Sequence, residues 1–145
     1  MDTTQHWLDL LQENSCRVTA PRRVIVETLV NSPRALDALD LFDLCRQVQP
    51  GIGLVTVYRT LEKLEELGLI QRVHREDGCH MVMKAAVGHQ HYLVCTSCGR
   101  TTLFEGDDIS PLIHNVEGQT GFLVDDHWLQ LFGRCPDCRE KADVQ

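Results

Sequence analysis

Two closely spaced cysteine pairs constrain what this 145-residue chain can fold into more than any other feature. They are Cys95-Thr-Ser-Cys98 and Cys135-Pro-Asp-Cys138, and 36 residues separate them. Four thiolates in two such pairs match a closed, tetrahedral zinc site, which is structural because four protein ligands leave no open position for water or substrate. We therefore expect one structural Zn²⁺ that ties together the ends of a small folded unit. Two disulfides, or four free core thiols, are the alternative.

The N-terminal sequence indicates the cellular compartment, and the distribution of charge indicates which half of the chain can bind DNA. The first residues lack a basic leader and an apolar stretch, and no apolar run reaches the length of a membrane span. We therefore expect a cytoplasmic protein without membrane contact, where reducing conditions favour metal over disulfides. The net charge of −7 is uneven, because residues 1–75 carry 9 Lys/Arg and 10 Asp/Glu whereas residues 76–145 carry 5 and 11. Any DNA-binding face must lie in the first half.

The first half reads as helices followed by a hairpin. Thr19 and Asp37 are good N-caps, and Gly68 is a natural helix end. The sharpest apolar stripe is helical in spacing and is made by Val57, Leu61, Leu64 and Leu67. Two apolar segments, 69–75 and 79–83, flank an Asp-Gly turn signal. The order predicts a winged helix-turn-helix.

The second half reads as short strands with one helix, after a weakly patterned linker at residues 84–88. The patterns predict strands over 91–94, 100–105, 122–125 and 127–132, and a helix over roughly 109–117. The expected fold class is therefore α+β, with an N-terminal winged helix-turn-helix over residues 1–86 and a small α/β domain over residues 87–145. A unit this small is marginal alone, and a structural zinc would offset that.

Several segments, in order, resemble the ferric uptake regulator family of metal-dependent transcriptional repressors, particularly its zinc uptake regulator branch. They are Arg17–Arg22, Thr56–Leu61, His89–Gly99 and His127–Cys135. The resemblance covers nearly the whole chain. It implies a homodimer with winged-helix DNA-binding domains, a C-terminal dimerisation domain, a palindromic operator and no enzymatic activity.

The DNA-binding residues are expected on the helix that contains Thr56. Tyr58 can present its ring to a thymine methyl group, and Arg59 can grip a phosphate or a guanine. Thr56 lies at the helix start, where N–H groups favour phosphate. Arg17 and Arg22 flank the expected groove, and the resemblance implies a minor-groove role at Arg17. The alternative is an ordinary solvated helix face.

A second, regulatory metal site is expected around three histidines. His89 and His91 alternate on a strand and share one face, and the resemblance implies that His127 completes the histidine set. The helix position where the family usually has Glu is Ser110 here, so the fourth ligand is open. We favour Glu105; the other candidates are Asp107, Asp108 and His114.

The family's other sensory site is expected to be lost or rebuilt. Its positions match residues that are mostly poor ligands here: Arg34, Met83, Gln90, Tyr92 and Leu103. Cys79 and His80, on the second strand of the hairpin, are candidates to rebuild it; a packed hairpin cysteine is the alternative. Soft or imidazole-rich ligands favour Zn²⁺ as the regulatory metal, with Fe²⁺ or Mn²⁺ as alternatives.

The expected function is a metal-responsive repressor of metal homeostasis genes, and three other functional classes are compared with it. An iron- or peroxide-responsive regulator of the same family is the nearest alternative. A zinc-stapled interaction module without sensing is an alternative of another class. A zinc hydrolase is disfavoured, because residues 89–91 read His-Gln-His where nucleobase deaminases have His-x-Glu, and the proline follows Cys135 instead of preceding it. The motifs H-E-x-x-H and G-x-S-x-G are also missing.

Overall fold

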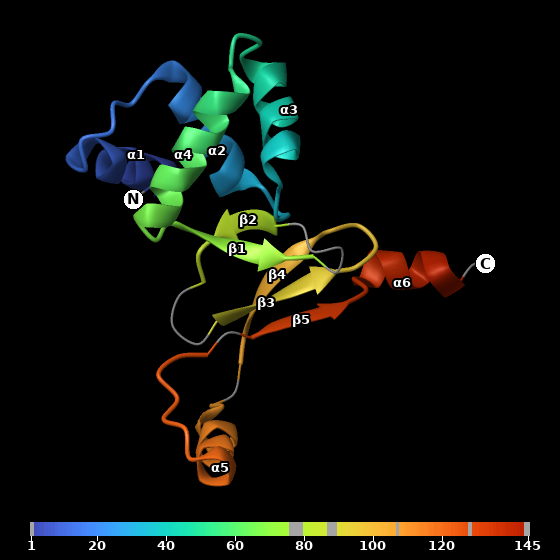
Figure 1. Cartoon of the computed structure of the whole chain (residues 1–145). Helices are drawn as coiled ribbons and strands as arrows, with labels where there is room; N and C mark the ends of the chain where they lie inside the picture. Colours follow the sequence, from blue (N-terminus) through green and yellow to red (C-terminus); the bar gives the residue numbers. More distant parts are fainter. Residues whose placement is uncertain (1, 76–79, 87–89, 107, 128, 144–145) are drawn as a thin grey trace. The chain divides into compact units, whose positions relative to one another are not determined.

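The computed structural model describes residues 2–75, 80–86, 90–106, 108–127 and 129–143, and Figure 1 shows its helices and strands. The chain divides into two compact units, Met1–Ala85 and Ala86–Gln145. The α+β fold class is confirmed, with a helical first unit and a small sheet in the second. Among the described helices, none is both long and apolar enough to span a bilayer.

The first unit is a four-helix arrangement followed by a hairpin. Its elements are α1 (Thr3–Glu13), α2 (Ala20–Asn31), α3 (Ala38–Val48), α4 (Leu54–Glu66), β1 (Ile70–His74) and β2 (His80–Lys84). The expected caps form: Thr19 Oγ1 accepts the Arg22 N–H at 3.4 Å, and Asp37 Oδ1 accepts the Asp40 N–H at 2.7 Å. Strands β1 and β2 pair antiparallel, so the hairpin forms the wing of a winged helix-turn-helix.

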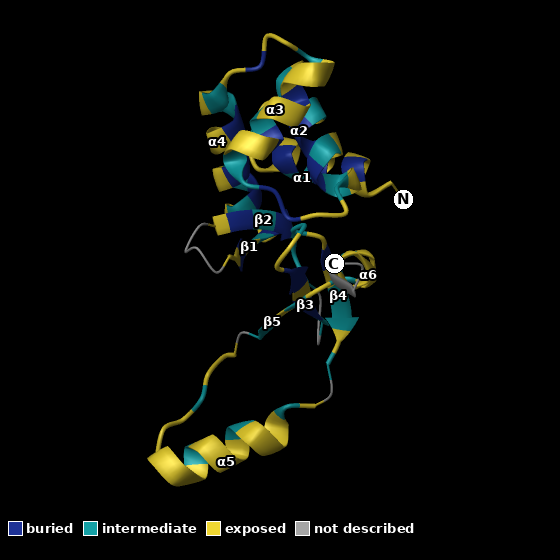
Figure 2. Cartoon of the chain, turned by 90° about the vertical axis from the view of Figure 1, so that its right-hand side faces the viewer, coloured by how far each residue is buried: buried dark blue, intermediate teal, exposed yellow. Residues whose placement is uncertain are grey.

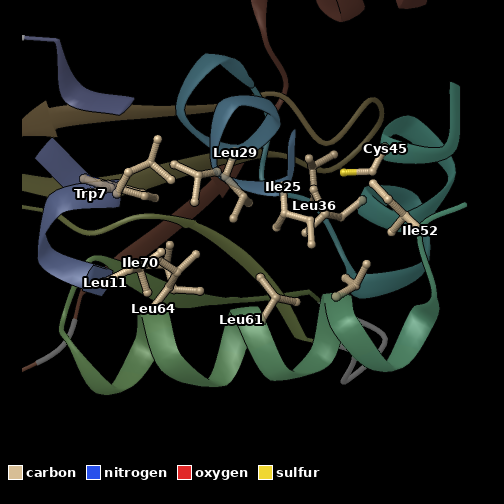
Figure 3. Packing of buried hydrophobic residues seen from close by; sticks show 14 residues of the cluster. Trp7, Leu11, Ile25, Leu29, Leu36, Cys45, Ile52, Leu61, Leu64 and Ile70 are labelled. Carbon is tan, nitrogen blue, oxygen red and sulfur yellow. The ribbon is translucent and has the colours of Figure 1, made fainter. Parts of the chain in front are cut away.

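The core of the first unit is built on one face of α4, as Figure 3 shows. Val57, Leu61 and Leu64 on α4 are buried, as the helical stripe predicts. They pack with apolar side chains from α1, α2, α3 and β1, including Leu11, Ile25, Leu29, Leu41 and Ile70. The opposite face of α4 is left exposed. Gly68, at φ +72°, supplies the left-handed residue that ends the helix.

The second unit is a three-stranded sheet with two helices. Its elements are β3 (Gln90–Cys95), β4 (Thr101–Glu105), α5 (Ser110–Thr120), β5 (Gln130–Gly133) and α6 (Pro136–Asp143). The strand order is β4-β3-β5, with β4 antiparallel and β5 parallel to β3. Because parallel neighbours end at the same edge of a sheet, the ends of β3 and β5 bring the two cysteine pairs together.

The sequence expectations for the second unit need three corrections. The strand expected over 122–125 is wrong, since these residues have no regular structure and Phe122 and Leu123 are 75% and 82% exposed. Helix α6 was not expected. The strand expected over 127–132 begins only at Gln130, as β5, so His127 precedes the strand. Helix α5 forms as expected but buries none of its residues, as the burial colouring in Figure 2 shows.

Candidate functional site

The four cysteines of the two pairs come together at the edge where β3 and β5 end. Their sulfur atoms all lie within 4.8 Å of one another. A zinc ion bound at 2.3 Å in a tetrahedron holds its sulfurs about 3.8 Å apart, and the Sγ atoms of Cys98 and Cys135 are 3.8 Å apart. All four thiols are free, which excludes the two-disulfide alternative. The residues present therefore fit a structural Zn²⁺.

Backbone geometry prepares the sulfurs for a cation. The Cys135 N–H donates to Cys95 Sγ at 3.4 Å, and the Arg100 N–H donates to Cys98 Sγ at 3.5 Å. Gly99, at φ +76°, provides the left-handed turn that points the Arg100 N–H back at the sulfur. Cys138 lies in the first turn of α6, whose N-terminal dipole also favours thiolate.

Two of the four thiols, those of Cys95 and Cys138, have shifted pKa values. Burial raises the pKa of Cys95, but N–H donors, Cys135 first, outweigh burial and lower this pKa to about 6. A side-chain hydrogen bond with Cys135, helped by burial, raises the pKa of Cys138 to about 12. The shifts oppose each other because a sulfur that gives up its proton is stabilised by a neighbour that keeps one. A bound dication replaces that shared proton and deprotonates all four sulfurs.

Two contacts that the sequence motifs did not predict join the two cysteine pairs. Thr96 donates from its backbone N–H to the Gly133 carbonyl at 2.8 Å, and Arg100 Nη2 lies 3.1 Å from Asp137 Oδ2. Their positions in the sequence could have indicated the ion pair, because Arg100 lies just after the first cysteine pair and Asp137 lies inside the second. Both side chains of the ion pair are exposed, so it contributes little to stability, and the sulfurs dominate.

The structure brings together two of the three histidines expected to bind the regulatory metal. The rings of His91 on β3 and His127, which precedes β5, have centroids 5.8 Å apart. His91 is buried, whereas His127 is exposed. His89 lies outside the described residues. Within the described part of the chain, the cysteine cluster is the single group of three or more close metal-binding side chains.

The structure does not place Glu105 beside these histidines. The β3–β4 register sets Glu105 opposite Gln90 and Phe104 opposite His91. Since paired residues share a face and successive residues alternate, the Glu105 side chain lies on the other face of the sheet from His91. At the start of α5, Asp108 Oδ1 accepts hydrogen bonds from Ser110, from the N–H at 2.9 Å and from the hydroxyl at 2.5 Å.

The two other candidates for the fourth ligand are not placed beside the histidine pair among the described residues. Asp107 lies outside the described residues. His114 Nδ1 is 3.7 Å from Glu117 Oε1 on the exposed side of α5.

An apolar cavity adjoins His127. Its volume is about 250 Å³, and almost all of its lining is aliphatic. The lining residues come from α5 and from the segment between α5 and β5: Ile109, Leu112, Ile113, Val116, Val124, His127 and Leu129. Among the described lining residues, His127 is the one with a polar side chain, and it connects the cavity to the histidine pair.

The expected DNA-contacting residues of α4 lie away from the core. Tyr58 is 48% exposed and Arg59 is exposed, whereas the neighbouring Val57 and Thr60 are buried. Thr56 is half-buried in the first turn, and its carbonyl accepts the Thr60 hydroxyl at 2.7 Å. Gly53 caps α4 without a side-chain hydrogen bond, so the first N–H groups of the helix have no side-chain partner there.

Arg17 and Arg22 differ from each other in the structure. Arg17 is exposed, in the irregular segment before α2. Arg22 is half-buried, and its Nη1 donates to the Arg17 carbonyl oxygen at 2.7 Å. The Arg22 Nε is buried without a hydrogen-bond partner among the described residues. Arg22 therefore holds the backbone of the segment that carries Arg17.

The second candidate site on the hairpin is described only in part. Cys79 lies outside the described residues. His80 is exposed at the start of β2, directly opposite His74 of β1. Met83 is buried on the alternate face of β2, opposite Gln71. The hairpin thus separates His80 from the position that the family resemblance assigns to the other sensory site.

Comparison with known proteins agrees with this architecture. The ferric uptake regulator family matches residues 13–132. The ferric uptake regulation protein of Neisseria meningitidis is 30% identical over 133 residues, covering 91% of this chain and 92% of that protein. Its counterpart in Bacillus subtilis is 34% identical over 135 residues, covering 90% and 91%. A solved structure described as a zinc-bound manganese uptake regulator is 28% identical, with a TM-score of 0.71, covering 92% and 99%.

A winged-helix unit joined to a small sheet unit with a four-cysteine cluster defines a metal-responsive DNA-binding regulator, not an enzyme. The chain belongs to the ferric uptake regulator family. Regulators of this family bind divalent metals and DNA and act as dimers.

Proposed function

We propose that this protein is a cytoplasmic, zinc-responsive repressor of metal homeostasis genes. The observation that carries the choice of zinc is the ligand chemistry near His91 and His127. Two imidazoles lie within reach of one ion, and the helix position where the family usually has Glu is occupied by Ser110. Imidazole nitrogens suit zinc, whereas additional carboxylates would suit manganese or iron.

Geometry supports a metal between the two rings. An ion bound at 2.0–2.1 Å to a ring nitrogen lies about 3.2 Å from the ring centroid, so two coordinating rings can be up to about 6.4 Å apart. The separation of 5.8 Å is within that limit. We propose His89 as the third imidazole, because the sequence spacing of His89 and His91 is the one expected for ligands on one face of a strand. The bound ion would supply a positive charge that draws these ligands together.

The carboxylate ligand is proposed to be either Glu105 or Asp108. Glu105 ends β4 on the other face from His91, so its participation requires the end of the strand to turn. Asp108 is exposed and is already oriented by Ser110 at the start of α5. Separate Glu105→Gln and Asp108→Asn variants distinguish them, because only the ligand variant should weaken the exchangeable metal.

The proposed mechanism is a population shift in a homodimer. The segment over residues 87–145 serves as the metal-binding dimerisation domain, using apolar side chains that are exposed in the single chain, such as Leu112, Val116 and Phe122. The segment over residues 1–86 binds DNA. Metal binding favours the dimer conformation in which two α4 helices match the half-sites of a palindromic operator. Tyr58 and Arg59 contact bases or phosphate, Thr56 and Arg17 support them, and Arg22 holds Arg17 in place.

Iron is the second candidate effector. The curated relatives at 30–34% identity are named ferric uptake regulation proteins, and this observation favours Fe²⁺. A peroxide-responsive regulator of the same family is the third candidate.

The deciding experiment measures metal content and DNA affinity on the same samples. Protein holding its structural zinc is titrated with buffered Zn²⁺, Fe²⁺ and Mn²⁺, the iron series without oxygen, while anisotropy follows binding to the natural operator. Zinc should raise DNA affinity at the lowest free concentration. Iron acting at lower free concentration than zinc would overturn the zinc assignment. Affinity independent of every metal would reduce the protein to a zinc-stapled module without sensing.

Three variants control this titration. His91→Ala and His127→Ala should retain one tightly held zinc but lose the exchangeable metal and the metal response. His114→Ala is the matched control, because His114 lies on the exposed side of α5 beside Glu117 and outside the proposed ligand set. Its response should equal that of the parent protein.

A further inference from the structure

A second pair of histidines, separate from the one described above, lies in the first unit. His74 is the last residue of β1 and His80 is the first residue of β2, and the two are direct cross-strand partners. Their ring centroids are 4.9 Å apart and the ring planes are inclined by 72°. Both residues are exposed. The hairpin therefore presents two imidazoles to solvent at the end of its paired strands.

The separation of these rings fits a shared metal ion. Two imidazoles bound at tetrahedral angles to an ion 2.0–2.1 Å from each nitrogen would have centroids about 5.2 Å apart. The observed 4.9 Å is within a few tenths of an ångström of that value. Direct cross-strand partners have Cβ atoms about 4.5–5.5 Å apart, so the backbone already sets this spacing. Little reorganisation of the strands is needed for both rings to bind one ion.

The surroundings do not oppose a dication. Two arginines lie close in sequence, but each has a carboxylate nearby. Arg72 Nε is 2.8 Å from Glu65 Oε1, and Arg75 Nη1 is 3.9 Å from Asp37 Oδ2. These ion pairs offset the positive charge that would otherwise repel a metal at the histidines.

Strand alternation separates this pair from the other sites of the protein. His80 lies on the same face of β2 as Val82, which packs against the helical core, whereas Met81 and Met83 lie on the alternate face. The pair is therefore on the opposite face from Met83, the position expected to belong to the family's other sensory site. It also shares no residue with the His91–His127 pair.

We propose that His74 and His80 form a two-histidine site for a late first-row divalent cation, with water completing the coordination. The ion cross-links β1 and β2 at the end of the wing. Imidazole ligands and the general affinity order of such metals predict tightest binding for Cu²⁺, weaker binding for Ni²⁺ and Zn²⁺, and the weakest for Mn²⁺. Since ligand nitrogens must be unprotonated, protons compete with the metal and binding weakens in acid.

The test uses the full chain with its structural zinc in place and Ni²⁺ as the probe. Histidine side chains labelled with ¹⁵N are followed by NMR while the paramagnetic ion is added. The ring signals of His74 and His80 should broaden together at one Ni²⁺ concentration, and the ring signals of His6 and His114 should broaden only at higher concentration. Independent broadening of His74 and His80 would overturn the proposal.

Calorimetry gives the second measurement. The background is a Cys79→Ser, His89→Ala, His91→Ala, His127→Ala chain, in which the nearby thiol and the proposed regulatory histidines are absent. Adding His74→Ala or His80→Ala should weaken Ni²⁺ binding by about tenfold or more, because even the loss of a residue that only supports a metal ligand weakens metal binding by that much. Adding His114→Ala should leave Ni²⁺ binding unchanged. Equal binding in all four chains would overturn the site. Because the regulatory histidines are already absent, this outcome is independent of the function proposed above.

Discussion

At the scale of single residues, Arg22 shows how one side chain can shape a surface that it does not itself form. Its guanidinium is half-buried and holds the carbonyl of Arg17, while Arg17 extends into solvent. Both residues are expected at the DNA-binding surface, yet their environments differ. A planar, forked donor suits the positioning role, and the compact ammonium of lysine does not reproduce it.

This contrast makes a prediction for Arg22. Arg22→Ala should lower the free energy of unfolding by about 1 kcal/mol, typical of one hydrogen bond, and should weaken DNA binding through the Arg17 segment. Arg22→Lys should weaken DNA binding nearly as much, because it keeps the charge but loses the fork. Denaturant melts and anisotropy titrations measure the two effects. Full recovery of affinity in the lysine variant would instead identify Arg22 as a phosphate contact.

Tyr92 on β3 makes a prediction about alkaline stability. Burial raises the pKa of its phenol to about 12, and a backbone hydrogen bond with Ala86 offsets this only in part. Between the ordinary pKa near 10 and this value, the folded protein holds a proton that the unfolded chain has released. Stability should therefore fall as pH rises through this window, by on the order of 2 kcal/mol. Below pH 10 both states are protonated, and no change is expected.

The measurement is a series of denaturant melts from pH 9 to pH 12 on the parent protein and Tyr92→Phe. Other groups titrate in this range, so the difference between the two proteins is the relevant quantity. The phenylalanine variant should lose less stability across the window. Parallel pH profiles would show that the phenol ionises equally well in the folded protein.

At the scale of elements, α4 has one buried face, which stabilises the fold, and one exposed face, which we propose for DNA recognition. Its buried stripe of Val57, Leu61 and Leu64 fixes it in the core, and Tyr58 and Arg59 remain outside. Substitutions on the exposed side should consequently change DNA binding without changing the fold. Within the first unit, α4 contacts α2 and the wing strand β1.

Tyr58 and Arg59 should respond differently to mutation. Tyr58→Ala should cost about 1–3 kcal/mol of binding to the operator while leaving non-specific binding nearly unchanged, as expected for a base contact. Arg59→Ala, if it removes a phosphate contact, should reduce the slope of log affinity against log salt concentration by about 1. Anisotropy titrations at several salt concentrations measure both, and unfolding melts control for stability. Unchanged binding in both variants would refute a recognition role for α4.

Elements with capping residues or apolar patterns in their own sequence could be predicted, and elements without such local signals could not. Helices α2 and α3 were predicted because Thr19 and Asp37 supply caps that act within a few residues. Helix α6 was missed because it is polar and begins inside the second cysteine pair, where a metal-binding turn was the simpler interpretation. The strand over 122–125 was wrongly predicted from apolar content, since none of the described strands lies beside it to pair with.

The candidate sites divide in the same way. The four cysteines could be assigned from spacing, because each pair is local and both ends are marked. The face of the sheet on which the Glu105 side chain lies could not be predicted from the sequence. It depends on the register between β3 and β4, which no local motif sets. The pairing of His74 with His80 likewise required the hairpin register.

At the scale of the whole molecule, we expect zinc bound at the cysteine cluster to determine whether the second unit is stable. That unit has a three-stranded sheet, and α5 contributes no buried residue to it. A structural zinc contributes an apparent binding energy of about 10–16 kcal/mol in small peptides, which is comparable to the stability of an entire domain. The first unit has its own apolar core and does not depend on this metal.

Removing the metal should therefore unfold one unit and spare the other. In Cys95→Ser, or after strong chelation, the sheet unit should lose its amide NMR dispersion and the protein should become monomeric. The helical unit should keep its dispersion and its CD spectrum. Sedimentation and zinc analysis complete the measurement. A Cys95→Ser chain that stays dimeric with one tightly held zinc would contradict the assignment of the four ligands.

The parallel pairing of β3 with β5 also has a consequence for how the protein folds. These strands are neighbours in the sheet, although the cysteine pairs that follow them are 36 residues apart in the chain. Closing such a loop costs entropy before any contact repays it, so pairing of this kind is intrinsically slow. A zinc ion captured first by Cys95 and Cys98 would hold one end ready for Cys135 and Cys138. During synthesis β3 and β4 emerge earlier than β5, so the availability of zinc sets how soon the sheet can be completed.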